Sequence, residues 1–542
     1  MDKKKKQGGG KRWTWLMLGL AAVFVVLMSL PFLVEGCGWL ALLGFVPLLC
    51  MERVASRTGM RHFWWWHYGT FTVWNFVTTY WVCNATVGGG IFAALANALQ
   101  MSLVFGLFRW VKRRTKGVVP YVFLAAAWIA WEKYYLTVAQ ISWPWLVLGT
   151  AFAGTTGLVQ WYEFTGSLGG SLWVWVASLS LFGLMVALSD GRFASRWNGK
   201  ARVAAVAGTV LALFGPMLVS AVIGSKFEEV SEGKVEVVIA QPNFDPYQKF
   251  TSLTQEQQTA ILLDQFAQEL KSRDASDPVL LVAPETFTSD ILCNDVPSSR
   301  TFRRFRSFLS DHPGAEILFG ASSWTRYEQA ERPSANARRL GDGSWYETHN
   351  SALIMDSLGR YQIYQKSKLV PGVEMLPYPS VLGPIDDRIL GGVAGRCVGQ
   401  PEVSNLVFNQ SVPIGCAVCY ESVYGEHCAK YVRAGAKLLA VITNDAWWGD
   451  TPGYRQHLSY ARLRAIETRR DIVRCGNTGI SALIDQKGRI LERTPWWEQA
   501  VLQGSVNLSS RETFFVRTGD IIGRLGVLVF VLLLAAALFR RK

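Results

Sequence analysis

Apolar residues dominate two stretches of this 542-residue chain, 13–224 and 520–539, whereas residues 230–510 have the mixed composition of a soluble protein. A helix needs about 20 mostly apolar residues to cross a bilayer. Segments that approach or reach this length lie at 13–34, 36–50, 63–83, 89–109, 118–136, 166–189, 203–224 and 520–539. The chain is therefore predicted to be a multi-span α-helical membrane protein with a soluble block inserted before its last span.

These segments divide the chain into three parts. We expect a membrane domain with about seven transmembrane helices at residues 1–229, judged by the length that a span requires. A soluble domain should occupy residues 230–512, and a C-terminal transmembrane helix with a basic tail should occupy 513–542. Glu132 and Glu163 fall near the ends of predicted spans, where we expect them to be solvated.

Basic residues alternate between the loops in a way that sets the orientation of the chain. Lys and Arg number six in 1–12, three in 51–62, five in 109–117, four in 190–202 and three in 540–542. The intervening loops carry almost none, apart from Lys133. Cytoplasmic loops of membrane proteins carry the excess of Lys and Arg. We therefore expect both termini in the cytoplasm and the block 230–512 on the opposite side of the membrane.

The same loops account for the formal net charge of +14. They hold 21 basic and 3 acidic residues, which leaves 34 basic and 38 acidic residues for the rest of the chain. A domain that binds nucleic acid needs a basic face. The soluble block therefore gives no reason to expect a nucleic-acid partner.

Strand and helix patterns alternate along the soluble block. Apolar runs typical of strands lie at 234–242, 279–282, 315–320, 350–356, 361–364, 412–418, 437–443, 480–484 and 489–493. Helical spacing of apolar residues lies at 254–272, 300–309, 422–436 and 456–470. Strands that alternate with helices indicate an α/β layer architecture.

Three chemically active side chains stand where predicted strands end. Glu285 follows the strand 279–282, Lys366 follows 361–364, and Cys419 follows 412–418. A carboxylate, an amine and a thiol can serve as general base, charge stabiliser and nucleophile in acyl transfer. An adjacent ammonium group lowers the pKa of a thiol, so we expect a lowered pKa for Cys419.

Several short motifs occur in an order that resembles the carbon–nitrogen hydrolase (nitrilase) superfamily over residues 234–510. They are Pro284-Glu285, Tyr364-Gln365-Lys366, Leu369-Val370-Pro371, Cys419-Tyr420-Glu421, Thr443-Asn444-Asp445-Ala446-Trp447-Trp448-Gly449-Asp450, Gln456-His457 and Asn477-Thr478-Gly479. The resemblance implies a nitrilase-like α-β-β-α sandwich. Because the chain also has predicted membrane spans, it resembles in particular the membrane-bound bacterial members of this superfamily, which add the third acyl chain to lipoproteins.

The resemblance also implies roles for single residues. Glu285 would be the general base, Lys366 the stabiliser of the oxyanion, and Cys419 the nucleophile. Lys368 is the alternative candidate for the lysine, but the family register favours Lys366. Cys416 and Cys419 together match the C-x-x-C pattern. Cys416 lies inside an apolar strand, however, so we expect it to be a buried packing residue.

Three further residues match positions that support activity in the family, namely Glu374, Tyr420 and Glu421. The family usually has Phe-Gly before the second carboxylate, whereas Gly372-Val373 precede Glu374 here. Candidates for substrate binding or gating are Asn444, Trp447, Trp448 and Tyr378. Large aromatic residues suit a site that opens at a membrane surface, but they also pack protein cores, and both interpretations stay open.

The function implied by the resemblance is transfer of a fatty acyl chain from a membrane phospholipid to an apolipoprotein. The chain would pass through a thioester on Cys419 to the α-amino group of the N-terminal S-diacylglyceryl cysteine. We expect a monomer in the bacterial inner membrane, with the catalytic domain on the periplasmic side. We expect no cofactor. We also expect no metal, because His427 and His457 could be ligands but show no paired spacing typical of a metal site.

Two other functions remain open on the sequence. A membrane-anchored, nitrilase-type amidase would hydrolyse a small amide with the same three residues. A non-catalytic membrane scaffold would have no need to retain Glu285, Lys366 and Cys419 together. A small-molecule amidase has no evident need for eight spans, which favours acyl transfer.

Overall fold

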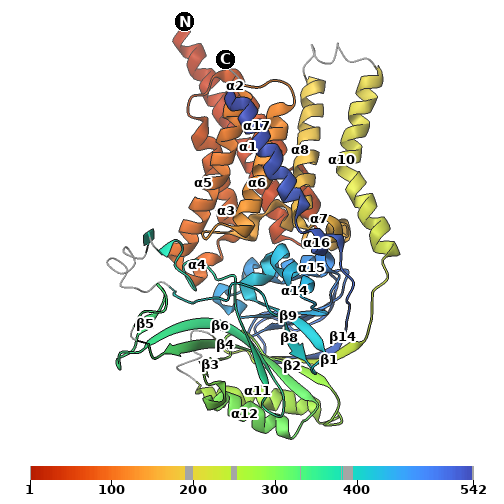
Figure 1. Cartoon of the computed structure of the whole chain (residues 1–542). Helices are drawn as coiled ribbons and strands as arrows, with labels where there is room; N and C mark the ends of the chain where they lie inside the picture. Colours follow the sequence, from red (N-terminus) through yellow and green to blue (C-terminus); the bar gives the residue numbers. More distant parts are fainter. Residues whose placement is uncertain are drawn as a thin grey trace. The chain divides into compact units, whose positions relative to one another are not determined.

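The computed structural model describes residues 2–189, 199–245, 253–329, 331–379, 381–382 and 395–539 (Figure 1). The chain forms two compact units. Unit 1 comprises residues 1–139, 143–227 and 520–542, and unit 2 comprises 140–142 and 228–519. The predicted basic tail 540–542 and most of the basic loop 190–202 lie outside the described residues.

Unit 1 is built of helices, and a helix forms at each of the eight predicted spans. Its described α-helices are α1 (Asp2–Leu33), α2 (Ala41–Thr58), α3 (Phe63–Thr79), α4 (Val82–Ala85), α5 (Val87–Lys112), α6 (Val119–Thr137), α7 (Tyr162–Thr165), α8 (Ser167–Ser189), α10 (Gly199–Lys226) and α17 (Ile521–Phe539). Within the described part of the chain, six helices are long and apolar enough to cross a membrane. Helix α3 has 17 residues, and α6 carries Glu132 and Lys133. These two are not among the six, so the number of spans stays a prediction.

Aromatic rings from several helices fill the interior of unit 1. Phe45 of α2 packs against Trp128 of α6 and Trp175 of α8, with ring centroids 5.2 and 4.2 Å apart. The expectation that Glu132 and Glu163 are solvated is wrong, because both are buried. Glu132 is accommodated by the Leu148 backbone N–H, which donates to its Oε1 over 2.8 Å. A buried carboxylate needs such donors to replace water.

Unit 2 contains two β-sheets. The first has the strand order β14-β1-β2-β4-β6-β5, with β3 paired to β4 and β7 paired to β6, and the second has the order β13-β12-β11-β10-β9-β8. The strands are β1 (Lys234–Gln241), β2 (Val279–Val282), β3 (Thr288–Leu292), β4 (Ala315–Tyr327), β5 (Arg338–Arg339), β6 (Trp345–Met355), β7 (Tyr361–Gln365), β8 (Leu406–Phe408), β9 (Val412–Val418), β10 (Leu438–Thr443), β11 (Ile472–Gly476), β12 (Ala482–Ile484), β13 (Ile490–Arg493) and β14 (Ala500–Asn507). Strands β1, β2 and β4 are parallel in the first sheet, as are β9, β10 and β11 in the second.

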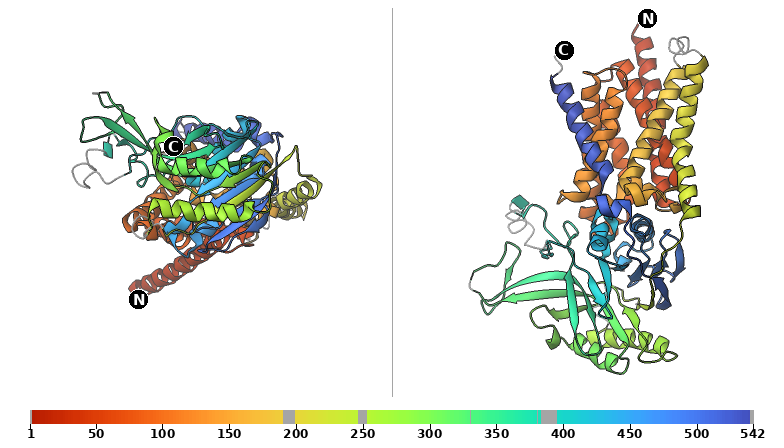
Figure 2. Two further views of the ribbon diagram at one scale, coloured as in Figure 1. Left: turned by 90° about the horizontal axis from the view of Figure 1, so that it is seen from below. Right: turned by 45° about the vertical axis from the view of Figure 1, so that its right-hand side comes forward.

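A pair of helices covers the outer face of each sheet. Helices α11 (Gln255–Leu270) and α12 (Arg300–Ser310) lie across the first sheet, as Figure 2 shows from below. Helices α14 (Gly425–Arg433) and α15 (Pro452–Thr468) pack on the second, and the short α16 (Phe514–Thr518) contacts both of them.

The alternation of side chains along each strand divides the apolar residues between two cores. On β2, Leu281 faces the outer core with Phe266 and Phe305. Leu280 lies in the core between the sheets with Cys475, whose Sγ contacts the Val282 carbonyl oxygen. The four layers are therefore helix, sheet, sheet and helix, which confirms the predicted nitrilase-like α-β-β-α sandwich.

The strands differ from the sequence prediction in their length and in their number. The strand predicted at 315–320 continues to Tyr327, because β4 pairs with β6 along its whole length, from Ile317 with Met355 to Tyr327 with Trp345. Strands β3, β5, β8, β11 and β14 were not predicted. Strand β11 contains Arg474, whose charge interrupts the apolar run even though the residue is fully buried.

Candidate active site

Strand direction brings the predicted site residues to the carboxyl ends of parallel strands. Glu285 follows β2, Cys419 follows β9 and Asn444 follows β10. In α/β sheets, this end of the strands is where ligands bind.

Glu285 enters the site because its backbone lies close to β4. A Cβ on Gly320 would come within 2.5 Å of the Glu285 Cα, so only glycine fits there. The Gly320 N–H donates to the Pro284 carbonyl oxygen over 3.1 Å and fixes this approach. On the second sheet, the Asn444 N–H donates to Glu285 Oε2 over 3.0 Å.

Lys366 lies at the end of β7, with no exposed side-chain surface. Its Nζ is 2.8 Å from Glu374 Oε1 and 3.4 Å from Glu285 Oε1. Burial opposes the charge of Lys366, but the carboxylates of Glu374 and Glu285 outweigh it and raise the pKa well above the usual lysine value. Lys368 instead places its Nζ over the Tyr424 ring, 5.5 Å from the centroid.

Asn350 on β6 is a member of this group that the sequence analysis did not single out. Its Nδ2 donates to Glu285 Oε1 over 2.8 Å and to Glu374 Oε1 over 2.7 Å. Both carboxylates therefore receive hydrogen bonds from Asn350 as well as from Lys366. A polar residue at the start of an otherwise apolar predicted strand, 350–356, was the available signal.

A tight turn directs Glu374 toward Lys366. The Glu374 N–H donates to the Val370 carbonyl oxygen over 2.9 Å, and the Val370 N–H donates to Glu374 Oε2 over 2.7 Å. Gly372 adopts the left-handed conformation, with φ +84°. The Val373 side chain is 61% exposed. The unusual Gly372-Val373 pair is therefore compatible with a carboxylate in contact with Lys366.

Cys419 begins a one-turn helix, η7 (Cys419–Val423), with a φ of +50°. This conformation is strained for a residue other than glycine. The prediction of a lowered pKa for Cys419 is wrong. Burial, and then the Glu285 carboxylate, raise the pKa of this thiol well above its usual value and outweigh the opposite effect of Lys366. The resting thiol is therefore protonated and needs a base.

Cys416 has no exposed surface and lies in the core between the two sheets. This confirms the prediction that it is a packing residue. Burial raises the pKa of its thiol.

Glu421 connects the segments that carry Cys419 and Lys366. Its Oε2 accepts from the Val418 N–H over 2.9 Å. Its Oε1 accepts from the Ser367 N–H over 2.7 Å. Burial opposes its charge, but His427 and the hydrogen bonds lower the pKa of Glu421. The ionised carboxylate therefore holds the residue before Cys419 and the residue after Lys366.

Tyr420 and Tyr378 both contact the short segment 140–142 of unit 2. The Tyr420 hydroxyl donates to the Ser142 carbonyl oxygen over 3.0 Å. The Tyr378 N–H donates to Gln140 Oε1 over 2.6 Å, and the Tyr378 side chain is 39% exposed. Residues far apart in the sequence thus meet beside the turn that carries Cys419.

The two tryptophans of the Asn444–Asp450 motif have different environments. Trp447 is 42% exposed. Trp448 is half-buried against the apolar core around the second sheet and packs edge-on against His457, with ring centroids 5.5 Å apart. The structure thus separates two side chains that the sequence analysis had grouped as gating candidates.

A second buried polar group lies beside Cys419, formed by Asp445, His457 and Arg474. His457 Nδ1 is 2.8 Å from Asp445 Oδ1, and Arg474 Nη2 donates to Asp445 Oδ2. Burial opposes ionisation, but Arg474 and His457 lower the pKa of Asp445 to about 2.

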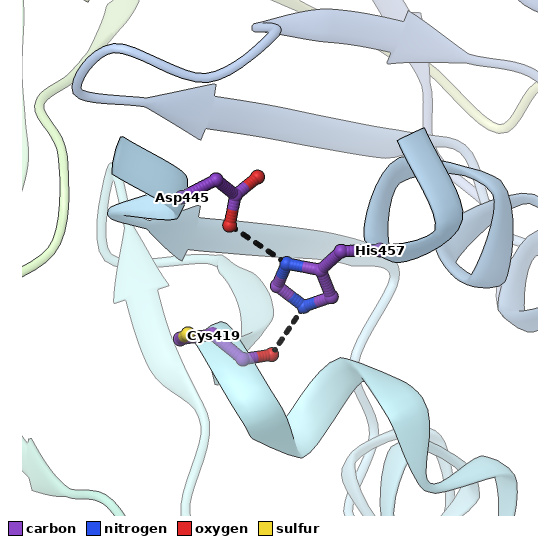
Figure 3. A group of neighbouring side chains, drawn as sticks. All are labelled: Cys419, Asp445 and His457. Atoms are coloured by element: carbon purple, nitrogen blue, oxygen red, sulfur yellow. Dashed lines mark hydrogen bonds and ion pairs between the residues drawn. The ribbon is translucent and has the colours of Figure 1, made fainter. Parts of the chain in front are cut away.

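The order Cys419, His457, Asp445 suggests a protease-like triad, but the geometry differs. His457 Nε2 is 3.1 Å from the Cys419 carbonyl oxygen. Figure 3 shows this oxygen turned toward the imidazole ring and the sulfur on the other side of the residue. His457 therefore contacts the backbone of Cys419 and is not placed as a base for its thiol.

Ligand atoms of Cys419, Asp445 and His457 lie within 4.8 Å of one another, a separation that could suit a metal ion. The donors are already engaged, however. Arg474 pairs with the Asp445 carboxylate, and both nitrogens of the His457 ring have oxygen partners. A metal would have to break these contacts, so the group fits a hydrogen-bonded network better than a metal site.

Comparison with known proteins agrees with this fold. The family model for the carbon–nitrogen hydrolases matches residues 223–514. The model for the apolipoprotein N-acyltransferase N-terminal domain matches residues 21–180.

Two curated relatives match nearly the whole chain. The apolipoprotein N-acyltransferase of Chlorobaculum tepidum is 29% identical over 519 residues, which cover 92% of this chain and 92% of that protein. The apolipoprotein N-acyltransferase of Geobacter metallireducens is 29% identical over 542 residues, which cover 96% of this chain and 95% of that protein. The chain is thus a multi-pass membrane protein that belongs to the carbon–nitrogen hydrolase family and joins that family's domain to the N-terminal domain of the apolipoprotein N-acyltransferases.

Proposed function

We propose that this protein transfers a fatty acyl chain from a membrane phospholipid to the α-amino group of the N-terminal S-diacylglyceryl cysteine of apolipoproteins. The observation that carries the proposal is the buried group of Glu285, Lys366 and Glu374 beside Cys419. The membrane unit gives this chemistry access to lipid, and the names of the relatives agree with a lipoprotein acceptor.

In the first half of the reaction, Glu285 accepts the proton of the Cys419 thiol as the sulfur attacks the ester carbonyl carbon of the phospholipid. Lys366 stabilises the negative charge that develops on the carbonyl oxygen. The C–O bond of the ester then breaks, and Glu285 returns the proton to the departing lysophospholipid oxygen. The acyl chain remains on Cys419 as a thioester.

In the second half, the α-amine of the apolipoprotein attacks the thioester carbonyl carbon. Glu285 accepts a proton from the attacking amine, and the C–S bond breaks as the amide forms. The Cys419 sulfur takes the proton back and restores the starting state. A thioester suits this two-step reaction because it reacts readily with amines and persists if water is excluded.

Mass spectrometry of the purified, full-length protein tests the proposal. Incubation with an ester-linked phospholipid should add one fatty acyl mass to the peptide that contains Cys419. Addition of a diacylglyceryl-modified peptide should remove that mass and produce an N-acylated peptide. The Cys416→Ser variant is the matched control and should form the adduct normally.

The result that would overturn acyl transfer is release of free fatty acid with no amide product at any peptide concentration. That outcome would favour a hydrolase, as in the amidase alternative. Complete inertness of Cys419 toward phospholipid would reject lipid as the donor.

We further propose that the protein acts as a monomer in the bacterial inner membrane, with unit 2 on the periplasmic side and both termini in the cytoplasm. The alternation of Lys and Arg between loops supports this orientation. Topology reporters fused after Val230 and after Lys542 should report opposite sides of the membrane. A cytoplasmic signal from the first fusion would contradict the orientation.

A further inference from the structure

Two buried side chains, Ser422 and His457, lie within hydrogen-bond distance of the Cys419 carbonyl oxygen. The Ser422 hydroxyl donates to it over 2.7 Å. His457 Nε2 lies 3.1 Å from it and 3.0 Å from the Ser422 hydroxyl oxygen. His457 and Ser422 are both fully buried. The carbonyl oxygen only accepts hydrogen bonds, and the Ser422 hydroxyl gives its hydrogen to that oxygen. His457 Nε2 therefore faces two acceptors and must act as a donor.

The ring of His457 is fixed in this orientation from behind. Asp445 Oδ1 lies 2.8 Å from Nδ1, and Asp445 itself is held by Arg474 and by the Thr443 hydroxyl, which donates to Oδ1 over 2.7 Å. Trp448 packs edge-on against the ring. The imidazole therefore has little freedom to turn toward the sulfur.

The geometry of the peptide bond passes this constraint to the other side of Cys419. The Cys419 carbonyl and the Tyr420 N–H belong to one planar trans peptide unit, in which they point in opposite directions. Two donors that hold the carbonyl on one side therefore determine where the N–H points on the other. Hydrogen bonds accepted by a carbonyl also polarise the unit and strengthen its N–H as a donor.

We propose that His457, supported by Asp445, is a positioning residue that holds the Cys419 carbonyl and thereby directs the Tyr420 N–H at the oxyanion of the acyl-transfer intermediate. This inference rests on the proposed function in so far as Cys419 must attack a carbonyl carbon. It assigns to His457 a role that the Glu285–Lys366–Glu374 group does not fill. It also explains how the strained φ of +50° at Cys419 is maintained.

Two reactions of Cys419 separate positioning of the oxyanion from an effect on the thiol itself. Attack on a short p-nitrophenyl ester forms an oxyanion, whereas alkylation by iodoacetamide displaces iodide and forms none. The His457→Leu variant should slow acylation by roughly 10- to 100-fold, somewhat less than direct loss of an oxyanion donor. KM for the ester and the rate of alkylation should change little.

The His457→Gln variant supplies the conservative comparison, because its side-chain amide can still donate to the Cys419 carbonyl. It should recover most of the acylation rate. Ser422→Ala removes the other donor to the same oxygen, so it should slow acylation and leave alkylation unchanged. It also tests the proposal independently if His457→Leu fails to fold, as judged by thermal melting.

Equal slowing of acylation and alkylation in a folded His457→Leu variant would overturn the proposal, since His457 would then act on the thiol. A His457→Gln variant as defective as His457→Leu would overturn it too. The p-nitrophenyl ester reacts with any acyl-accepting thiol. A wild-type protein that accepts this ester but not phospholipid would therefore reject the proposed function and leave the role of His457 intact.

Discussion

Two buried polar groups flank Cys419, and they differ in the part of the residue that they address. Glu285 raises and Lys366 lowers the pKa of the thiol, with a smaller upward shift from Asp445, and Glu374 pairs with Lys366. Asp445 and His457 hold the backbone carbonyl. In the proposed mechanism the first group exchanges a proton with the substrate. The second group is held by Arg474, and its histidine faces the Cys419 carbonyl oxygen and not the sulfur.

The comparison teaches that residue type alone does not assign a catalytic role. A cysteine, a histidine and an aspartate are the components of a well-known triad, yet here the histidine contacts the wrong atom for a base. In the proposed mechanism the base is instead a glutamate from the other sheet. Substitutions in the two groups should therefore have different effects on acylation and on alkylation of Cys419.

The largest effect is expected for the residue that both groups share. Cys419→Ser should lower acyl transfer by about 10⁴-fold or more, within the range found when a nucleophile is removed. Its melting temperature should stay near that of the wild type, because the change is nearly isosteric. Cys416→Ser, which alters a packing residue on the same strand, should retain most of the activity. The reverse behaviour of the two variants would show that the nucleophile has been misassigned.

Glu285→Gln tests the thiol-facing group and should lower acyl transfer by about 10²- to 10⁴-fold, the usual contribution of a general base. The same variant should increase the rate at which iodoacetamide alkylates Cys419. The Glu285 carboxylate raises the pKa of Cys419, so its removal should lower that pKa and increase the thiolate fraction at a given pH.

A pH series with iodoacetamide measures this difference. In the wild-type protein, alkylation of Cys419 should keep rising with pH beyond about 8.5, the usual thiol pKa. In Glu285→Gln the same rise should occur at lower pH. Slower alkylation in the variant at every pH would contradict the assigned electrostatics.

Glu374→Gln should have a smaller effect, since Lys366 keeps its contact with Glu285. The change weakens a charge-assisted hydrogen bond worth about 1.5–3 kcal/mol. That corresponds to roughly 10- to 100-fold in the rate constant for thioester formation. Glu402→Gln, at an exposed position, is the matched control. Unchanged acylation in Glu374→Gln would exclude a supporting role for this carboxylate.

The smallest effects should separate Trp447 from Trp448. Trp448→Ala removes a ring that packs on His457, so it should slow acylation equally with long-chain phospholipid and with a short soluble ester. Trp447→Ala removes an exposed ring and should slow only the reaction with phospholipid, by a few-fold, with little change in melting. If the Trp447→Ala variant reacts equally slowly with both substrates, Trp447 does not act as a gate for phospholipid.

Much of the fold was accessible from the sequence because each element carries a local signal. Long apolar runs predicted the helices of unit 1, and alternating strand and helix patterns predicted the α/β layers of unit 2. The sandwich itself was implied by the resemblance to the nitrilase superfamily. Strand β11 was missed because Arg474 is buried with a partner, Asp445, that is distant in sequence. Glu132 was misjudged for a similar reason, since its backbone donor at Leu148 lies on another segment.

The sequence by itself determined the architecture and the chemical types at the ends of strands, because hydrophobic periodicity and strand direction act locally. Only the tertiary structure decided which atoms face one another. Asn350 joins Glu285 to Glu374, and His457 faces a carbonyl and not a thiol. It also decided that the Cys419 pKa is raised, because the balance between burial, a carboxylate and an ammonium depends on distances that no local pattern records.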